Sequence, residues 1–205
     1  MDSTMTKPCS AFSKSSRHSS QQAGFTLIEV LIAGAIMTIG LLSVLGMFTT
    51  ALASAQTSQL DELGHARATQ ALESVYTARQ TAQLGWDSIN NTGTITNGTA
   101  GIFTTGMATL TDPGPDGLDG TSDDVATAPI VLPGPDGILG GTHAADDQTI
   151  SLANFQRQIQ ISLAIDPTSG AQIPTLKQVV VTIQYPTSTG MIRTYQVQAL
   201  VSQYR

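Results

Sequence analysis

The feature that most constrains this chain is an uncharged run near its N-terminus. The 31 consecutive residues 30–60 contain no Asp, Glu, Lys, Arg or His, and the part from Leu31 to Phe48 is almost entirely apolar. About 20 such residues span the hydrocarbon core of a bilayer as a helix, whereas a helix in a soluble core is rarely apolar on every face. The run therefore predicts a membrane-spanning helix, provided that the single acid Glu29 is accommodated at its start.

The residues before this run indicate its orientation. They contain Lys7, Lys14, Arg17 and His18 against one acid, Asp2, and a basic flank is typical of a cytoplasmic N-terminus. A secretory signal has an apolar core of about 7–15 residues, followed by a small-residue cleavage site. Here the apolar stretch is longer and the small-residue pair at positions 23–24 precedes it, which disfavours an ordinary signal peptide.

The small-residue pair opens the sequence Gly-Phe-Thr-Leu-Ile-Glu-Val-Leu at residues 24–31. This sequence resembles the processing motif of type IV prepilins and of the pseudopilins of type II secretion. In that family a prepilin peptidase cuts after the glycine and methylates the new N-terminus. The resemblance implies a leader of residues 1–24, cleavage between Gly24 and Phe25, and N-methylation of Phe25.

Glu29 would be the fifth residue of the mature chain. An ionised acid inside a membrane helix costs several kcal/mol unless it is paired, and cleavage creates a partner, the α-amine of Phe25 in a neighbouring subunit. The resemblance implies that this pair sets the register of subunits during assembly. The alternative is that Glu29 reaches the lipid headgroups, which is compatible with pairing because it applies to the unassembled subunit.

The helix is expected to continue beyond the membrane. No proline lies between Pro8 and Pro113, and apolar residues recur at helical spacing in the segment 60–76. We expect one helix from about Phe25 to about Gln83, roughly 90 Å long at 1.5 Å per residue. It comprises a membrane or filament-core part at 25–53 and an amphipathic part at 54–84. The amphipathic face is formed by Leu60, Leu63, Ala68, Ala71, Leu72, Val75 and Tyr76.

Three segments near the C-terminus, 155–165, 176–185 and 192–201, alternate apolar and polar residues as half-buried antiparallel strands do. We expect an α+β, pilin-like fold, with the long helix packed on an antiparallel meander of about three strands within residues 155–205. Residues 85–154 are expected to be Thr/Gly-rich and acidic loops, with irregular structure or short strands at 85–111. The expected buried faces are Ile159, Ile161, Leu163 and Ile165; Val179, Val181, Ile183 and Tyr185; and Tyr195, Val197, Ala199 and Val201.

The loop segment 112–147 contains eight Asp and no Lys or Arg, and its sequence Gly-Pro-Asp-Gly occurs twice, at 114–117 and 134–137. Oxygen ligands on short turns suit Ca²⁺, and the first copy partly matches an EF-hand loop running from Asp112 to Asp123. Prolines at its second and fourth positions and the lack of flanking helices weaken the match. The alternative is a pair of solvated turns. The candidate calcium ligands are Asp112, Asp116, Asp119, Asp123 and Asp124.

Composition excludes several classes of function. The net charge is -6, so the chain lacks the basic surface of a nucleic-acid-binding protein. The single cysteine, Cys9, cannot form a disulfide within the chain. His65 and His143 lie near no nucleophile motif and at no metal-ligand spacing, so no enzymatic activity is expected.

These observations favour a minor type IV pilin, and residues 39–42 with the Gln/Ala-rich second part of the helix resemble PilV-type minor pilins. The expected location is the bacterial inner membrane, with a cytoplasmic N-terminus and a periplasmic head, and later the pilus. The expected partners are prepilin peptidase, other pilins through the N-terminal helix, and the inner-membrane assembly platform. The alternatives are a type II secretion pseudopilin and, in another class, a Ca²⁺-dependent tip adhesin.

Overall fold

The computed structural model describes residues 25–140, 144–187 and 190–204. The chain divides into two compact units, one ending at Met47 and one from Phe48 onward, which we call the head. The expected leader, including Gly24, lies outside the described residues.

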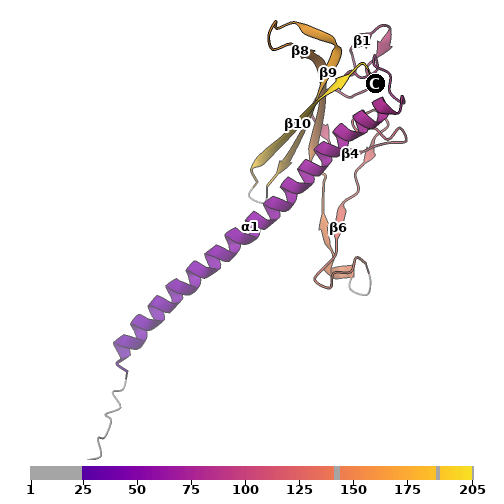
Figure 1. Ribbon diagram of the computed structural model, residues 1–205. Helices are drawn as coiled ribbons and strands as arrows, with labels where there is room; N and C mark the ends of the chain where they lie inside the picture. Colours follow the sequence, from indigo (N-terminus) through magenta and orange to yellow (C-terminus); the bar gives the residue numbers. More distant parts are fainter. Residues whose placement is uncertain (1–24, 141–143, 188–189, 205) are drawn as a thin grey trace, which may run out of the picture. The chain divides into compact units, whose positions relative to one another are not determined.

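One helix, α1 (Leu27–Gln80), runs through both units (Figure 1). Its bounds agree with the expected single helix to within a few residues. Thr26 precedes the first turn and serves as the N-cap, because its Oγ1 accepts the N–H of Glu29 at 3.3 Å. After the last turn, Ala82 adopts a φ of 65°, a left-handed conformation that commonly ends helices.

The head contains the antiparallel meander expected from the alternating segments. It is formed by β8 (Gln156–Ile165), β9 (Gln172–Pro186) and β10 (Ile192–Ser202). A short strand, β3 (Ala108–Thr109), adds a fourth member, so the order is β10-β9-β8-β3. The α+β architecture of a long helix on a small antiparallel sheet is confirmed.

The expected burial of Ile165 is wrong. The pairing of β8 with β9 shifts between Leu163, which pairs with Lys177, and Ala164, which pairs with Ile173, so three residues of β9 have no partner in β8 at this point. A shift of the pairing by an odd number of residues exchanges the two faces beyond it. Ala164 is therefore buried and Ile165 is 64% exposed.

The connection between α1 and the meander is made of two-stranded hairpins. Strands β1 (Ile95–Thr96) and β2 (Thr99–Ala100) flank a turn at 97–98, whose two residues both have positive φ, as tight hairpin turns require. The acidic segment forms two more hairpins. They pair β4 (Thr111–Asp112) with β5 (Val125–Ala126) and β6 (Ile130–Leu132) with β7 (Gln148–Ile150), and a short 3₁₀ helix, η1 (Ala144–Asp146), precedes β7.

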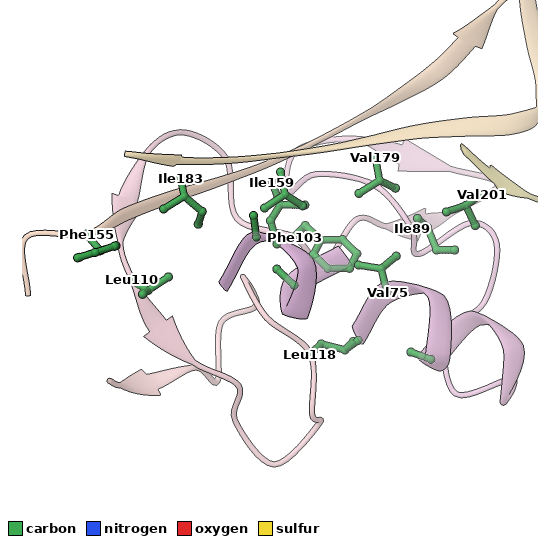
Figure 2. Packing of buried hydrophobic residues seen from close by; sticks show 14 of the residues in the cluster. Val75, Ile89, Phe103, Leu110, Leu118, Phe155, Ile159, Val179, Ile183 and Val201 are labelled. Atoms are coloured by element: carbon green, nitrogen blue, oxygen red, sulfur yellow. The ribbon is translucent and has the colours of Figure 1, made fainter. Parts of the chain in front are cut away.

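The core of the head lies between α1, the sheet and these loops (Figure 2). Small α1 residues such as Ala68 and Ala71 are fully buried there, which lets the helix backbone approach the sheet closely. At Gly64 the approach is closest, because a Cβ atom would stand only 2.5 Å from Cε1 of Tyr185. The buried apolar residues that the sequence pattern identified include Val75, Ile159, Val179, Val181, Ile183, Tyr185 and Val201.

Candidate functional site

The N-terminal segment combines an exposed first residue with a capped helix start. Phe25 is exposed and precedes the helix, while Glu29 lies in its first turn. Thr26 and Glu29 have the Thr-x-x-Glu spacing of a capping box, a local signal that our sequence analysis did not use. An acid in the first turn also interacts favourably with the helix dipole, so Glu29 suits this position even before any partner is present.

The first part of α1 leaves its apolar side chains uncovered. Every large apolar side chain from Leu27 to Phe48 is exposed, and none of the most apolar 18-residue window, with a mean hydropathy of 2.3, is buried. By length and composition α1 could cross a membrane. A helix with this much uncovered apolar surface needs lipid or other protein around it.

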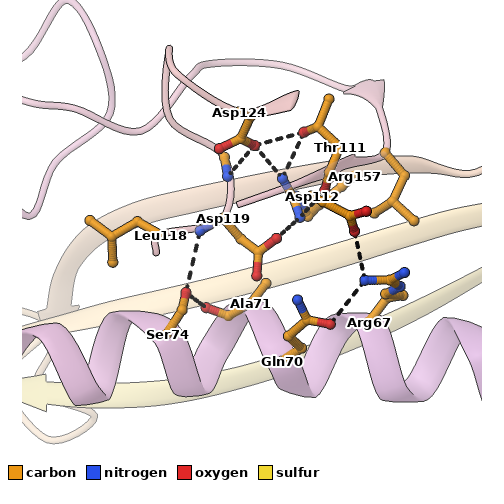
Figure 3. Close-up of polar contacts among 12 residues, drawn as sticks. Arg67, Gln70, Ala71, Ser74, Thr111, Asp112, Leu118, Asp119, Asp124 and Arg157 are labelled. Carbon is orange, nitrogen blue, oxygen red and sulfur yellow. Dashed lines mark hydrogen bonds and ion pairs between the residues drawn. The ribbon is translucent and has the colours of Figure 1, made fainter. Parts of the chain in front are cut away.

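The first acidic loop (residues 114–124) is attached to the head by a buried arginine (Figure 3). Arg157 on β8 forms ion pairs with Asp119 and with Asp124, the latter at 2.7 Å between Nη2 and Oδ2. Its guanidinium also donates to the carbonyl and hydroxyl oxygens of Thr111, at 3.2 and 3.0 Å. Removing Arg157 would leave two buried carboxylates without their partner, a costly state.

A second arginine contacts β4, the first strand of the hairpin that carries this loop. Arg67 on α1 contacts Oδ1 of Asp112 at 2.9 Å and donates to Gln70. Ser74 of α1 accepts the backbone N–H of Asp119 at 3.4 Å. The acidic segment is therefore attached to both the helix and the sheet.

The other two candidate calcium ligands make local contacts. Oδ1 of Asp116 accepts the N–H of Leu118 at 2.8 Å, and Oδ1 of Asp123 accepts the hydroxyl of Thr121 at 2.6 Å. These are turn-stabilising bonds of the kind that short polar side chains make.

The five acids are not gathered as a metal site. Asp112, Asp119 and Asp124 bind arginines, and in the described parts of the chain no group of three or more His, Cys, Asp or Glu could hold a metal ion. The geometry thus gives the calcium hypothesis no support. Calcium binding itself is not tested by the structure.

Two acids of the first loop have pKa values shifted in opposite directions. Burial raises the pKa of Asp119 above its ordinary value despite the nearby Arg157, and its Oδ2 has no hydrogen-bond partner among the described residues. The hydroxyl of Thr121 lowers the pKa of the exposed Asp123 carboxyl. The first acid is thus a structural element of the core, and the second belongs to the surface.

Sequence analysis missed two buried cations on the strands of the sheet, although the alternation contained the signal. Arg157 follows Phe155 and precedes Ile159 on the inward face of β8, and Lys177 precedes Val179 on that of β9. A cation on an inward-facing position implies a buried acceptor. For Lys177 the acceptors are the carbonyls of residues 86 and 89, at 2.9 and 2.8 Å, and burial lowers its pKa.

The comparisons with known proteins concern the N-terminus. Residues 19–45 match the family model of the prokaryotic N-terminal methylation motif. No curated protein and no solved structure matches the chain. The match supports a type IV pilin-like protein, in the pilin or pseudopilin class, and an inner-membrane, pilus-associated location. Proteins with this motif are prepilin peptidase substrates and structural subunits rather than enzymes.

Proposed function

We propose that the protein is a minor type IV pilin, a non-enzymatic structural subunit incorporated into a type IV pilus or priming its assembly. The observation that carries the proposal is the methylation motif at residues 19–45, which includes the start of a helix whose apolar side chains are exposed there. The head beyond that helix has the α+β organisation expected of a pilin.

In this proposal prepilin peptidase cuts between Gly24 and Phe25 and methylates Phe25. Cleavage leaves a charged amine four residues before Glu29, and the two groups on neighbouring subunits neutralise each other in an apolar filament core. Before assembly the N-terminus is cytoplasmic and the head periplasmic, as the basic flank favours.

Mass spectrometry of the chain co-expressed with prepilin peptidase tests the processing step. We expect an N-terminus at methylated Phe25. Gly24→Val should block cleavage because a branched side chain replaces the glycine at the cut bond, whereas Ser20→Val, four residues upstream, serves as the control and should not. A retained leader, or another N-terminus, would contradict the proposal.

A second experiment tests the role assigned to Glu29. Glu29→Gln should be cleaved normally but incorporated poorly into filaments, because the amine of Phe25 then lacks its counter-charge. Glu29→Asp keeps the charge and should retain more incorporation. Incorporation of Glu29→Gln at the wild-type level would show that the charge of Glu29 is not needed for assembly.

The motif is shared with pseudopilins, so the choice of a minor pilin, and of the PilV type, rests on the sequence of the helix at 39–42 and on its Gln/Ala-rich second part. Deletion of the gene separates the two classes. Loss of piliation with normal exoprotein secretion supports the pilin, and the reverse result supports the pseudopilin.

A further inference from the structure

The tip of the β1–β2 hairpin is the two-residue turn Asn97-Gly98. Both residues have positive φ, 48° and 79°, and both are exposed. The flanking strands each contain two residues and pair at two positions. Because a hairpin this short is marginally stable by itself, it opens locally more readily than the long strands of the sheet. The turn therefore samples conformations besides the one in the structure.

An asparagine that precedes a glycine reacts with its own backbone. The N–H nitrogen of the glycine attacks the side-chain carbonyl carbon Cγ, and the new C–N bond closes a succinimide ring. The bond between Cγ and Nδ2 breaks, and ammonia leaves with the proton that the attacking nitrogen gives up. Water then opens the ring at either carbonyl, which yields aspartate or isoaspartate. Glycine favours the attack because it has no Cβ to hinder its nitrogen.

The chain contains four glycines that directly follow an Asp or an Asn, and their N–H groups differ. The three in the acidic loops already donate: Gly117 to the carbonyl of Gly114 at 3.0 Å, Gly120 to the carboxylate of Asp124 at 2.8 Å, and Gly137 to the carbonyl of Gly134 at 2.9 Å. Within the described residues the N–H of Gly98 has no acceptor, and nothing lies within 4 Å of the place that its Cβ would take. Of the four, Gly98 thus has the one unbonded nucleophile in the described structure.

The other three asparagines are held more firmly than Asn97. Asn90 is 7% exposed, and its Nδ2 has two acceptors, at 3.0 and 2.9 Å. Asn91 forms two side-chain bonds to the backbone of β8, both at 2.7 Å. The N–H that follows Asn154 already donates to a carbonyl at 2.9 Å. Asn97 makes a single side-chain bond, from Nδ2 to Oδ1 of Asp87 at 3.2 Å.

We propose that Asn97 is a modification site, at which the chain deamidates itself through attack by the N–H nitrogen of Gly98. The reaction needs no enzyme and no reactant other than water, and it is one-way once ammonia has left. Each converted chain gains one negative charge, and an isoaspartate also adds one backbone atom to a two-residue turn. The fraction of modified chains therefore records the age of the protein.

The modification removes the bond that attaches the hairpin tip to the segment after α1. As an amide, Asn97 donates to the carboxylate of Asp87. The carboxylate that replaces the amide has no N–H to donate, and two negative charges at this distance repel each other. We expect the tip to detach from Asp87 and the hairpin to open more often.

Ageing of the full, unprocessed chain in detergent tests the reaction. The chain is incubated in a mildly alkaline buffer, and peptide mass spectrometry follows the replacement of NH₂ by OH at each asparagine. We expect conversion at Asn97 to be at least tenfold faster than at the other three, because Gly98 has neither a Cβ nor a bonded N–H. Part of the product should be isoaspartate, which enzymatic methylation detects.

A synthetic peptide of residues 93–101 is the positive control, because it has the same sequence without the fold. Conversion of the peptide but not of the folded chain would show that the turn protects Asn97, and this result overturns the proposal. So does conversion at Asn97 no faster than at the other asparagines. Asn97→Gln is the matched variant and should stay unmodified, because attack on its longer side chain would have to close a larger ring.

Hydrogen exchange tests the effect on the hairpin. The N–H of Gly101 donates to the carbonyl of Thr94 at 2.9 Å and closes the base of the hairpin. Asn97→Asp reproduces the aspartate product, so we expect severalfold faster exchange at Gly101 and unchanged exchange in β8 and β9. Wild-type exchange at Gly101 in this variant overturns the predicted detachment.

A second substitution tests whether repulsion is the cause. Asp87→Asn, combined with Asn97→Asp, restores an amide opposite a carboxylate with the two roles exchanged. Exchange at Gly101 should return toward the wild-type rate, and no recovery would show that repulsion by Asp87 is not the cause. None of these measurements depends on leader cleavage or assembly, so their failure is distinguishable from a failure of the proposed function.

Discussion

The first acidic loop and the second acidic loop (residues 134–140 and 144–147) share local hydrogen bonds. In each, the aspartate of Gly-Pro-Asp-Gly accepts the N–H of the residue two positions on: Asp116 from Leu118 at 2.8 Å, and Asp136 from Ile138 at 3.0 Å. In each, the last aspartate accepts the N–H of a glycine earlier in the loop at 2.8 Å: Asp124 from Gly120, and Asp147 from Gly140. The repeated residues thus determine the same turn twice.

The surroundings of the two loops differ. Leu118 is 3% exposed and Asp119 1% exposed, whereas the corresponding Ile138 and Leu139 are 61% and 59% exposed. The first loop inserts its apolar residue into the core and meets Arg157, while the second projects the equivalent side chains outward. The comparison shows that turn sequence decides loop geometry, and that contacts outside the loop decide whether it packs on the head.

The largest effect should follow from removing the cation on which the first loop depends. Arg157→Met leaves Asp119 and Asp124 without their partner in a buried site, and we expect the free energy of unfolding to fall by about 3–5 kcal/mol. Urea unfolding of the full chain in detergent, followed by the fluorescence of the sole tryptophan, Trp86, measures it. The control Arg193→Met, at an exposed pair, should cost about 0–1 kcal/mol. Equal losses in the two variants would contradict the difference between buried and surface pairing.

A smaller effect should follow from truncating the apolar residue of each loop. Leu118→Ala removes a buried side chain, and we expect a loss of about 2–3 kcal/mol in the same unfolding experiment. The matched change in the second loop, Ile138→Ala, should stay within about 0.5 kcal/mol. If both changes cost the same, the second loop packs against protein in solution and the contrast between the loops is wrong.

Asp119, the buried acid of the first loop, should make the free energy of unfolding depend on pH. Because the pKa of Asp119 is raised in the folded state, the folded chain binds more protons than the unfolded chain between about pH 4 and the raised pKa. The contribution of Asp119 to the free energy of unfolding therefore falls as pH rises through this range.

The difference in unfolding free energy between wild type and Asp119→Asn measures that contribution. It should change toward lower wild-type stability from about pH 4 upward. A change of the opposite sign would mean that attraction to Arg157 outweighs burial. Asp123→Asn is the control. The pKa of Asp123 is lowered, so its effect on the free energy of unfolding changes only at pH values below the ordinary pKa of an aspartate.

Calcium should have the smallest effect. Arginines already pair with three of the five candidate acids. We therefore expect millimolar calcium to give little heat in calorimetry and little change in the melting temperature of the head. Saturable binding that Asp116→Asn and Asp123→Asn abolish would instead support the calcium site that the sequence pattern suggests.

Much of the fold follows from patterns of short period. The helix from Leu27 to Gln80 and the three long strands were predictable because uncharged runs, helical spacing and alternation each report one local structure. The register shift after Leu163 was not predictable, since unpaired residues in one strand depend on its pairing with another. For the same reason Ile165 was assigned to the wrong face.

The candidate site was predictable only where it is local. The motif around Phe25 and Glu29 can be read directly from consecutive residues. The role of Asp119 could not be read in this way, because its partner Arg157 is 38 positions away. The same acidic pattern suits calcium, solvent or arginine. Only the inward position of Arg157 in an alternating strand hinted at which of these applies.

The attachment of α1 along β10 has a mechanical consequence. The helix is bound to the strand at Asp61 and again at Tyr76, 15 residues or about 22 Å further on. On β10 the matching sites, Arg193 and Leu200, are seven residues or about 23 Å apart. Tension applied along the helix is consequently distributed over contacts that are loaded in shear. The head can then resist pulling forces that would open the same contacts one at a time if they were peeled apart.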